Sequence, residues 1–175
     1  MKRNLLALSC LLALCKVSAA ENLTTYYEVQ QVLVKAANAI LGDRKGDFSY
    51  PGEPTADALV ETTGVPRELR EVAPHIYFIS GCRPHSCDEK SASLVDLDDG
   101  RLLVSGLRNF HCRAGSKGTG PSTECDGQPR LTIFVYQTKP AVAQRLSQEE
   151  QLKIIRQWAN QFGYSLEEVE VIPSP

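Results

Sequence analysis

Two cysteines five positions apart, Cys82 and Cys87, bracket an arginine, a proline, a histidine and a serine. Oxidation of the two thiols would close this stretch into a small ring. Proline fixes its own φ at about −65° and restricts the residue before it, so the ring is expected to be stiff. Such a loop presents one imidazole and is suited to insertion into the cleft of another protein. The residues of this candidate loop are Cys82, Arg83, Pro84, His85, Ser86 and Cys87.

Residues 1–20 have the features of a secretory signal, which decides how the other cysteines are interpreted. A basic start precedes an apolar run from Leu5 to Leu14, which is too short for a membrane span of about 20 residues, and small residues follow. Lipoprotein processing is disfavoured, because a bulky leucine precedes Cys15 and a cut at Cys10 would leave a very short apolar core. We expect a mature chain of residues 21–175 that folds as a single periplasmic domain without membrane attachment.

The charge balance of the mature chain is acidic. The full sequence has 19 Lys and Arg against 21 Asp and Glu, and loss of Lys2, Arg3 and Lys16 leaves 16 against 21, a net charge of −5. This balance argues against a nucleic-acid partner and favours a basic one, although solubility alone is the simpler explanation.

The mature chain contains four cysteines, which in an exported protein predict two disulfides with three alternative connectivities. We favour pairing between sequence neighbours. The second pair would then staple residues 114–123, a segment rich in glycine, serine, threonine and proline that cannot pack by itself. The favoured disulfides are Cys82–Cys87 and Cys112–Cys125.

Apolar periodicity predicts two long helices, over residues 25–41 and 147–162, each beginning with a capping box. A shorter helix is predicted over 55–63, residues 43–54 are predicted to form a loop, and 65–74 is ambiguous. The apolar face expected for the last helix consists of Leu152, Ile155, Ala159 and Phe162.

Strands are predicted where β-branched and aromatic residues cluster, and Asp98-Asp99-Gly100 marks a hairpin between two of them. The pattern predicts an α+β fold in which an antiparallel sheet is flanked by an N-terminal and a C-terminal helix. The candidate loop falls between two adjacent strands and is expected to project from one end of the sheet. The predicted strands cover 75–80, 92–97, 101–107, 130–137 and 168–172.

Metal and redox chemistry fit the candidate loop poorly. A zinc site from Cys82, His85 and Cys87, with His111 or Cys112 as fourth ligand, lacks the usual spacing, and oxidised cysteines do not bind metal. Thioredoxin-like enzymes place two residues between their cysteines at the start of a helix, whereas four lie here between strands. A simple turn staple remains the plain alternative.

Catalysis is not expected from this sequence. The three histidines are not accompanied by a nucleophile elbow, a paired-histidine zinc motif or a phosphate-binding loop. A cysteine nucleophile in the candidate loop would be silenced by a disulfide. We therefore expect a protein that is not an enzyme and that carries no cofactor or metal.

The stretch from Gly81 to Cys87 resembles the signature loop of the Ivy family, the periplasmic inhibitors of vertebrate lysozyme. That signature is a cysteine, a basic residue, proline, histidine, aspartate or asparagine, and a cysteine. Ser86 departs from the usual acid or amide. The resemblance covers residues 75–107, including the strand before the loop and the hairpin after it.

The resemblance implies that the loop enters the substrate cleft of a lysozyme. His85 would then hydrogen-bond to the two catalytic carboxylates, Cys82 and Cys87 would staple the loop, Pro84 would stiffen it, and Arg83 would bond to the cleft rim. The partner implied is a lysozyme or a related peptidoglycan hydrolase. Ser86 removes one charge from the family pattern and leaves open which hydrolase is the target.

Two alternatives stay open at this point. The chain is also compatible with an immunity protein against a secreted bacterial cell-wall hydrolase. In a different class, it is compatible with a periplasmic metal- or redox-binding protein. An oxidised loop with a protruding histidine favours the inhibitors, whereas free thiols with bound metal favour the binding protein.

Overall fold

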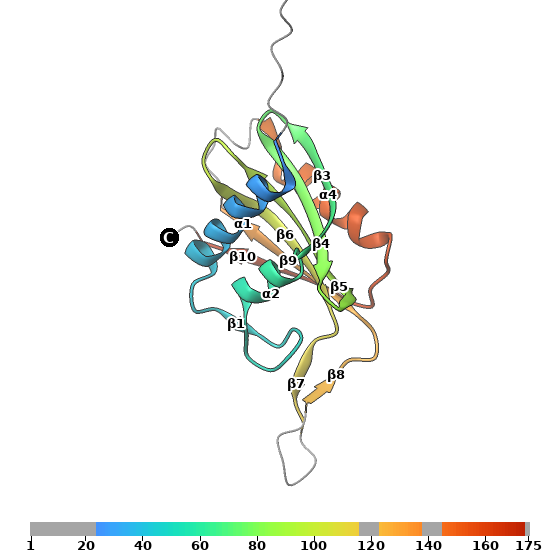
Figure 1. Cartoon of the computed structure of the whole chain (residues 1–175). Coiled ribbons are helices and arrows are strands. Elements are labelled where there is room, and N and C mark those ends of the chain that lie inside the picture. Colours follow the sequence, from blue (N-terminus) through green and yellow to red (C-terminus); the bar gives the residue numbers. More distant parts are fainter. Residues whose placement is uncertain (1–23, 116–122, 138–144, 174–175) are drawn as a thin grey trace, which may run out of the picture.

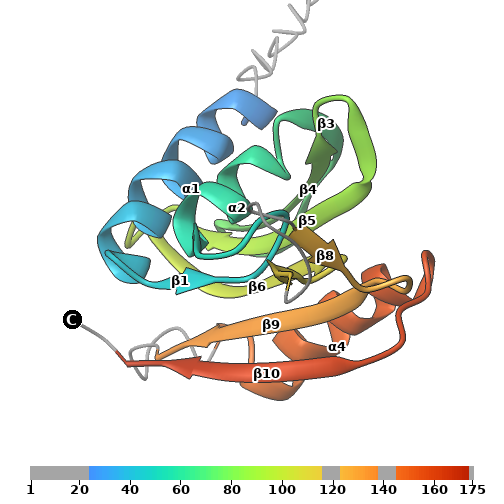
Figure 2. The same ribbon diagram turned by 90° about the horizontal axis from the view of Figure 1, so that it is seen from below.

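The computed structural model describes residues 24–115, 123–137 and 145–173. A six-stranded sheet forms the centre of the molecule. Two helices, α1 and α2, cover one face of this sheet, and α4 covers the other (Figures 1 and 2). The predicted α+β class and the two flanking helices are confirmed. The helices of the described part are α1 (Tyr26–Leu41), α2 (Thr55–Glu61) and α4 (Gln148–Asn160).

The strand order of the central sheet is β10-β9-β6-β5-β4-β3. All neighbouring pairs are antiparallel except β9 and β10. Two small ladders, β1 with β2 and β7 with β8, lie outside this sheet. The strands are β1 (Lys45–Gly46), β2 (Glu53–Pro54), β3 (Val65–Ala73), β4 (Ile76–Arg83), β5 (Ser86–Asp96), β6 (Arg101–Asn109), β7 (Cys112–Ala114), β8 (Thr123–Cys125), β9 (Arg130–Tyr136) and β10 (Glu167–Ile172).

Both long helices start as their capping boxes predict. The side chain of Thr25 accepts a hydrogen bond from the backbone N–H of Glu28, and that of Ser147 accepts one from Glu150. In return, each glutamate carboxylate accepts a hydrogen bond from the backbone N–H of its cap residue. The capping signal is local in sequence, which is why it located these helices correctly.

The sheet is buried on both faces because helices cover each of them. Along β9, Phe134 belongs to the core under α1 and α2, whereas Ile133 and Val135 belong to the core under α4. A Cβ on Gly106 would lie 2.5 Å from Ile155 Cγ2, so this glycine lets α4 pack directly on β6. These two cores fix the strands that carry the candidate loop.

Three details differ from the sequence-based expectations, and the structure also settles the one segment that the sequence leaves ambiguous. The last strand is parallel to its neighbour β9, because α4 separates the two in the chain and returns it to the same end of the sheet. The ambiguous segment 65–74 forms the edge strand β3, and the expected loop 43–54 contains a short ladder. Phe162 is 41% exposed and follows the end of α4, so it does not belong to the buried face of that helix.

The predicted signal segment 1–20 lies outside the described residues. Within the described ranges, helices are too short or too polar to cross a membrane.

Candidate functional site

The candidate loop is the turn of the β4–β5 hairpin. Arg83 pairs with Ser86 across the strands, which leaves Pro84 and His85 as the two turn residues. His85 has a φ of 65°, and proline followed by a positive-φ residue is the pattern of a type II turn. Both turn residues are exposed. The His85 side chain forms no hydrogen bond or ion pair with the residues that the structure describes, so its imidazole is available to a partner.

A second turn of the same composition lies at the other end of β4. Pro74 and His75 connect β3 to β4, and His75 has a φ of 59°. The Nδ1 atom of His75 lies 3.5 Å from Asp98 Oδ1, and its side chain is exposed. This turn has no cysteines beside it, and it therefore provides an internal comparison for the candidate loop.

Both disulfides favoured from the sequence are present. Cys82 bonds to Cys87 across the base of the turn, and Cys112 bonds to Cys125 between β7 and β8. The ladder shifts register after the turn, since Arg83 pairs with Ser86 but Cys82 pairs with Lys90. The first disulfide therefore spans a bulge in β5 and holds its extra residues against β4.

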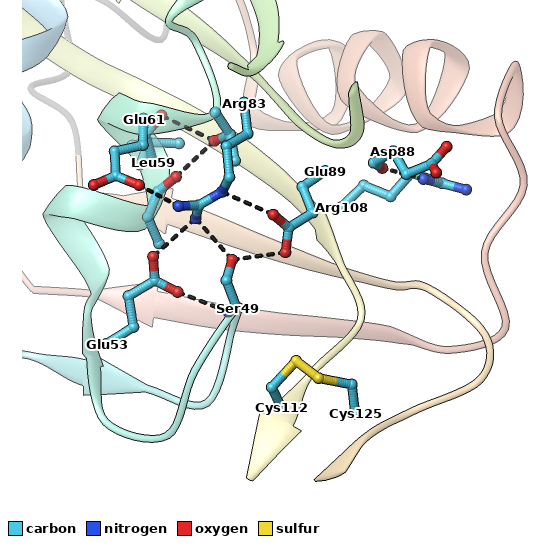
Figure 3. Close-up of polar contacts among 12 residues, drawn as sticks. Ser49, Glu53, Leu59, Glu61, Arg83, Asp88, Glu89, Arg108, Cys112 and Cys125 are labelled. Atoms are coloured by element: carbon cyan, nitrogen blue, oxygen red, sulfur yellow. Dashed lines mark hydrogen bonds and ion pairs between the residues drawn. A yellow bond between two sulfur atoms is a disulfide. The ribbon is translucent and has the colours of Figure 1, made fainter. Parts of the chain in front are cut away.

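Arg83 is largely buried at the base of the turn, in an ion cluster with three carboxylates (Figure 3). Its Nη2 atom lies 2.8 Å from Glu53 Oε1, its Nε atom lies 2.8 Å from Glu89 Oε2, and its Nη1 atom donates to Glu61. The contact to Glu89 is an ion pair without hydrogen-bond geometry. The Arg83 side chain is 15% exposed and Glu53 is fully buried.

Ser49 completes this cluster from the loop between β1 and β2. It accepts a hydrogen bond from Arg83 Nη2 at 2.7 Å and lies 2.6 Å from Glu89 Oε1, to which its hydroxyl donates. Its backbone N–H donates to Glu53 Oε2 at 2.7 Å. One arginine of the candidate loop is thus bonded to groups from β2, α2, β5 and the β1–β2 loop.

The electrostatics of the cluster favour a permanently charged arginine. Burial alone lowers the pKa of Arg83, but the hydrogen bond and charge of Glu53 with the charges of Glu89 and Glu61 outweigh it and raise the pKa above its usual value. The expectation that Arg83 bonds to the rim of a partner's cleft does not match this placement, because the guanidinium is occupied within the molecule. Its role in the structure is to fix the hairpin.

Two glycines allow close packing between the hairpin and the segment that joins α2 to β3. A Cβ on Gly81 would lie 2.7 Å from the Cα of Thr63, and a Cβ on Gly64 would lie 3.1 Å from the Pro84 ring. The end of α2 and the start of β3 are therefore packed against β4 and its turn, so that Pro84 contacts the body of the protein.

A tyrosine on α1 ties the same region to the first helix. The Tyr26 hydroxyl donates to the carbonyl oxygens of Thr63 and Ser80, at 2.9 Å and 3.1 Å as alternative acceptors. Burial raises the pKa of Tyr26 to about 12, from an ordinary value of 10.0.

This shift predicts a pH dependence of stability. The folded state favours the neutral phenol, so the contribution of Tyr26 is complete below pH about 10 and is lost as the pH rises towards about 12. Urea unfolding between pH 9 and pH 12 is the measurement. A Tyr26→Phe variant should lose less stability over this window than the parent. Identical losses in the two proteins would show that Tyr26 ionisation is not coupled to folding.

Removal of the loop disulfide is expected to lower stability only moderately. A Cys82→Ser/Cys87→Ser variant opens a ring that spans five positions, for which the chain-entropy relation gives about 2 kcal/mol. Urea unfolding of the variant and the parent at neutral pH measures the difference. The fold should persist, because the Arg83 cluster and the sheet remain; a variant that fails to fold would contradict this expectation.

The four cysteines that the structure describes are all in disulfides, so none of them is a thiolate in this state. Among the described residues, no three histidine, cysteine or acidic side chains are arranged to hold a metal ion. His111, the other histidine considered as a ligand, has a φ of 50° beside Cys112 and shapes the entry to the second ladder.

Sequence reasoning located the loop, its disulfide and its exposed histidine, but it missed the acidic partners of Arg83. Glu53, Glu61 and Glu89 are separated by up to 36 positions and carry no motif, so only the fold brings them together. Comparisons of the chain with protein-family models, with curated proteins and with solved structures found no match.

Proposed function

We propose that this protein is an exported inhibitor of lysozyme or of a related peptidoglycan hydrolase, with an Ivy-like arrangement of its hairpin and sheet. The observation that carries the proposal is the exposed, unbonded imidazole of His85 at the tip of a turn that is held by a disulfide and by an ion cluster. The loop sequence from Cys82 to Cys87 supports the same assignment.

The chemistry of a lysozyme active site matches a single imidazole. These enzymes need one protonated carboxylic acid and one carboxylate, which their environments keep in different protonation states. A neutral imidazole can donate to the carboxylate with one nitrogen and accept from the acid with the other. With both groups occupied in this way, neither is available to the glycosidic bond, and hydrolysis stops.

Rigidity of the hairpin favours tight binding. Ordering a flexible loop on binding costs conformational entropy. Here the disulfide, Pro84 and the Arg83 cluster already order the loop in the free protein, so less entropy is lost on binding. The acidic charge of the mature chain would favour encounter with a basic hydrolase.

The competing proposals differ in the partner or in the chemistry. An immunity protein would use the same hairpin against a bacterial cell-wall hydrolase. Ser86, which replaces the usual aspartate or asparagine of the family loop, leaves room for such a change of target. A metal- or redox-binding protein would need the Cys82 and Cys87 thiols to be reduced.

A turbidity assay on bacterial cell walls tests the proposal. Oxidised protein of residues 21–175 is added to a vertebrate lysozyme, a goose-type lysozyme and a bacterial lytic transglycosylase in parallel. Inhibition of any of the three enzymes supports the proposal, and inhibition of the transglycosylase alone identifies a bacterial hydrolase as the target. The immunity alternative predicts instead that the protein inhibits a cell-wall hydrolase secreted by a rival bacterium. Failure to inhibit any of them, together with metal binding by the reduced protein, would support the different class.

A further inference from the structure

A second concave site lies beside the candidate loop, on the side of the sheet covered by α4. It has a volume of about 300 Å³ and is bounded by the base of the β4–β5 hairpin, the edge strand β3 and the residues that end α4. The disulfide of the hairpin forms part of its wall. The lining residues that carry the argument are Arg67, Cys87, Lys90, Trp158, Gln161 and Phe162.

Two cations converge on this pocket. The Nη2 atom of Arg67 lies 2.9 Å from the sulfur of Cys87, and Nζ of Lys90 donates to the carbonyl oxygen of the same cysteine. Within the described ranges, neither cation has a carboxylate oxygen at ion-pair distance. Glu68 also lines the pocket, but its carboxylate accepts from Arg70 Nε at 2.7 Å.

The surroundings of Lys90 disfavour an uncompensated positive charge. Burial and the nearby Arg108 and Arg67 lower its pKa, and Asp88 only partly opposes them. Arg108 adds a further positive charge. Its guanidinium donates to the backbone carbonyl oxygens of Asp88, Phe162 and Gly163, which carry no net charge and do not neutralise it. A bound anion would supply the missing compensation.

Aromatic rings form the opposite wall. Nζ of Lys90 lies 4.5 Å from the centroid of the Phe162 ring, which packs edge-on against Trp158 at 5.8 Å between centroids. Phe162 is 41% exposed, whereas Trp158 is 4% exposed. The site therefore combines positive charge with an accessible apolar surface, as ligand pockets commonly do.

We propose that this pocket binds an organic carboxylate, held by Arg67 and Lys90, whose apolar body lies against Phe162 and the edge of Trp158. The carboxylate matches the two cations, because charge-assisted hydrogen bonds from arginine and lysine are the strong contacts for this group. The apolar body matches the aromatic wall. This site is separate from His85, and the proposal does not depend on the proposed inhibition of a hydrolase.

Benzoate is the probe, and benzamide, its neutral counterpart of nearly the same shape, is the control. Trp158 is the only tryptophan in the chain, so its indole N–H gives a single resonance in the spectrum of ¹⁵N-labelled protein. Titration of the oxidised protein with benzoate should move this resonance along a saturable curve, whereas benzamide should bind at least about tenfold more weakly.

Variants then assign the contact. An Arg67→Gln/Lys90→Gln protein should bind benzoate about 100-fold more weakly, since each charge contributes about tenfold. Lys153→Gln, which removes an exposed cation from α4 outside the pocket, should bind it as the parent does. Equal binding of benzoate and benzamide, or undiminished binding by the double variant, would overturn the proposal, as would a titration without a saturable shift.

The carboxylate can come from a free acid or from an acidic side chain of a bound protein. If it belongs to an inhibited hydrolase, benzoate should compete with that hydrolase and the double variant should inhibit less. If it is a free acid, the hydrolase should bind equally with and without benzoate. Both outcomes presuppose the charge-dependent benzoate binding described above.

Discussion

A His85→Gly variant is expected to inhibit lysozyme at least about 100-fold less well than the parent, with little change in stability. The imidazole would make two hydrogen bonds to the catalytic pair, of which the bond to the carboxylate contributes about 1.5–3 kcal/mol and the bond from the neutral acid about 0.5–1.5 kcal/mol. Glycine is the suitable replacement because residue 85 has a φ of 65°, which strains alanine but not glycine. The turbidity assay gives the inhibition, and thermal unfolding gives the stability.

The molecule supplies its own control for this variant. His75→Gly makes the same change in the matching Pro-His turn, where φ is 59°, at the opposite end of β4. It should leave inhibition unchanged. If both variants inhibit as well as the parent, His85 is not the blocking group. If both lose inhibition, the site is not confined to the disulfide-closed turn.

An Arg83→Met variant is expected to lose about 3 kcal/mol of stability. The substitution keeps most of the side-chain volume but leaves Glu53, which is fully buried, and Glu89 without their cation. Removing one member of a buried ion pair costs about 3–5 kcal/mol, because the remaining charge is uncompensated. We use the lower end because Glu61 is 55% exposed and remains hydrated. Urea unfolding of the oxidised protein measures this loss.

Arg44→Met provides the comparison for the arginine variant. Its partner is Glu170, and the two side chains are 46% and 41% exposed, so the pair is expected to contribute less than about 1 kcal/mol. Equal losses for the two variants would show that the Arg83 cluster is an ordinary surface pair. A stable Arg83→Met protein with full inhibition would show that the cluster does not position the hairpin.

Features set by nearby residues were predictable from the sequence. The capping boxes at Thr25 and Ser147 located the two long helices, and the Asp98-Asp99-Gly100 turn located the β5–β6 hairpin. Close spacing also gave the correct disulfides, since local pairing requires only that the chain turn back on itself.

Features set by tertiary contacts were not predictable. Arg83 has the same sequence neighbours whether it points outward or inward, and only the packing of β2 and α2 against the hairpin brings Glu53 and Glu61 to it. The parallel pairing of β10 depends on where α4 returns the chain. The pocket beside Cys87 likewise combines residues from β3, β5 and the end of α4, which no short motif connects.

The central claim is that the hairpin occupies the substrate cleft of a hydrolase. Steady-state hydrolysis of a soluble chitooligosaccharide, measured over a range of substrate and protein concentrations, tests this claim most directly once a hydrolase is inhibited. Occupation of the cleft predicts competitive inhibition, in which KM rises and kcat is unchanged. With the protein in large excess over the hydrolase and binding at equilibrium, a fall in kcat at constant KM would contradict the account, because the inhibitor would then bind outside the cleft.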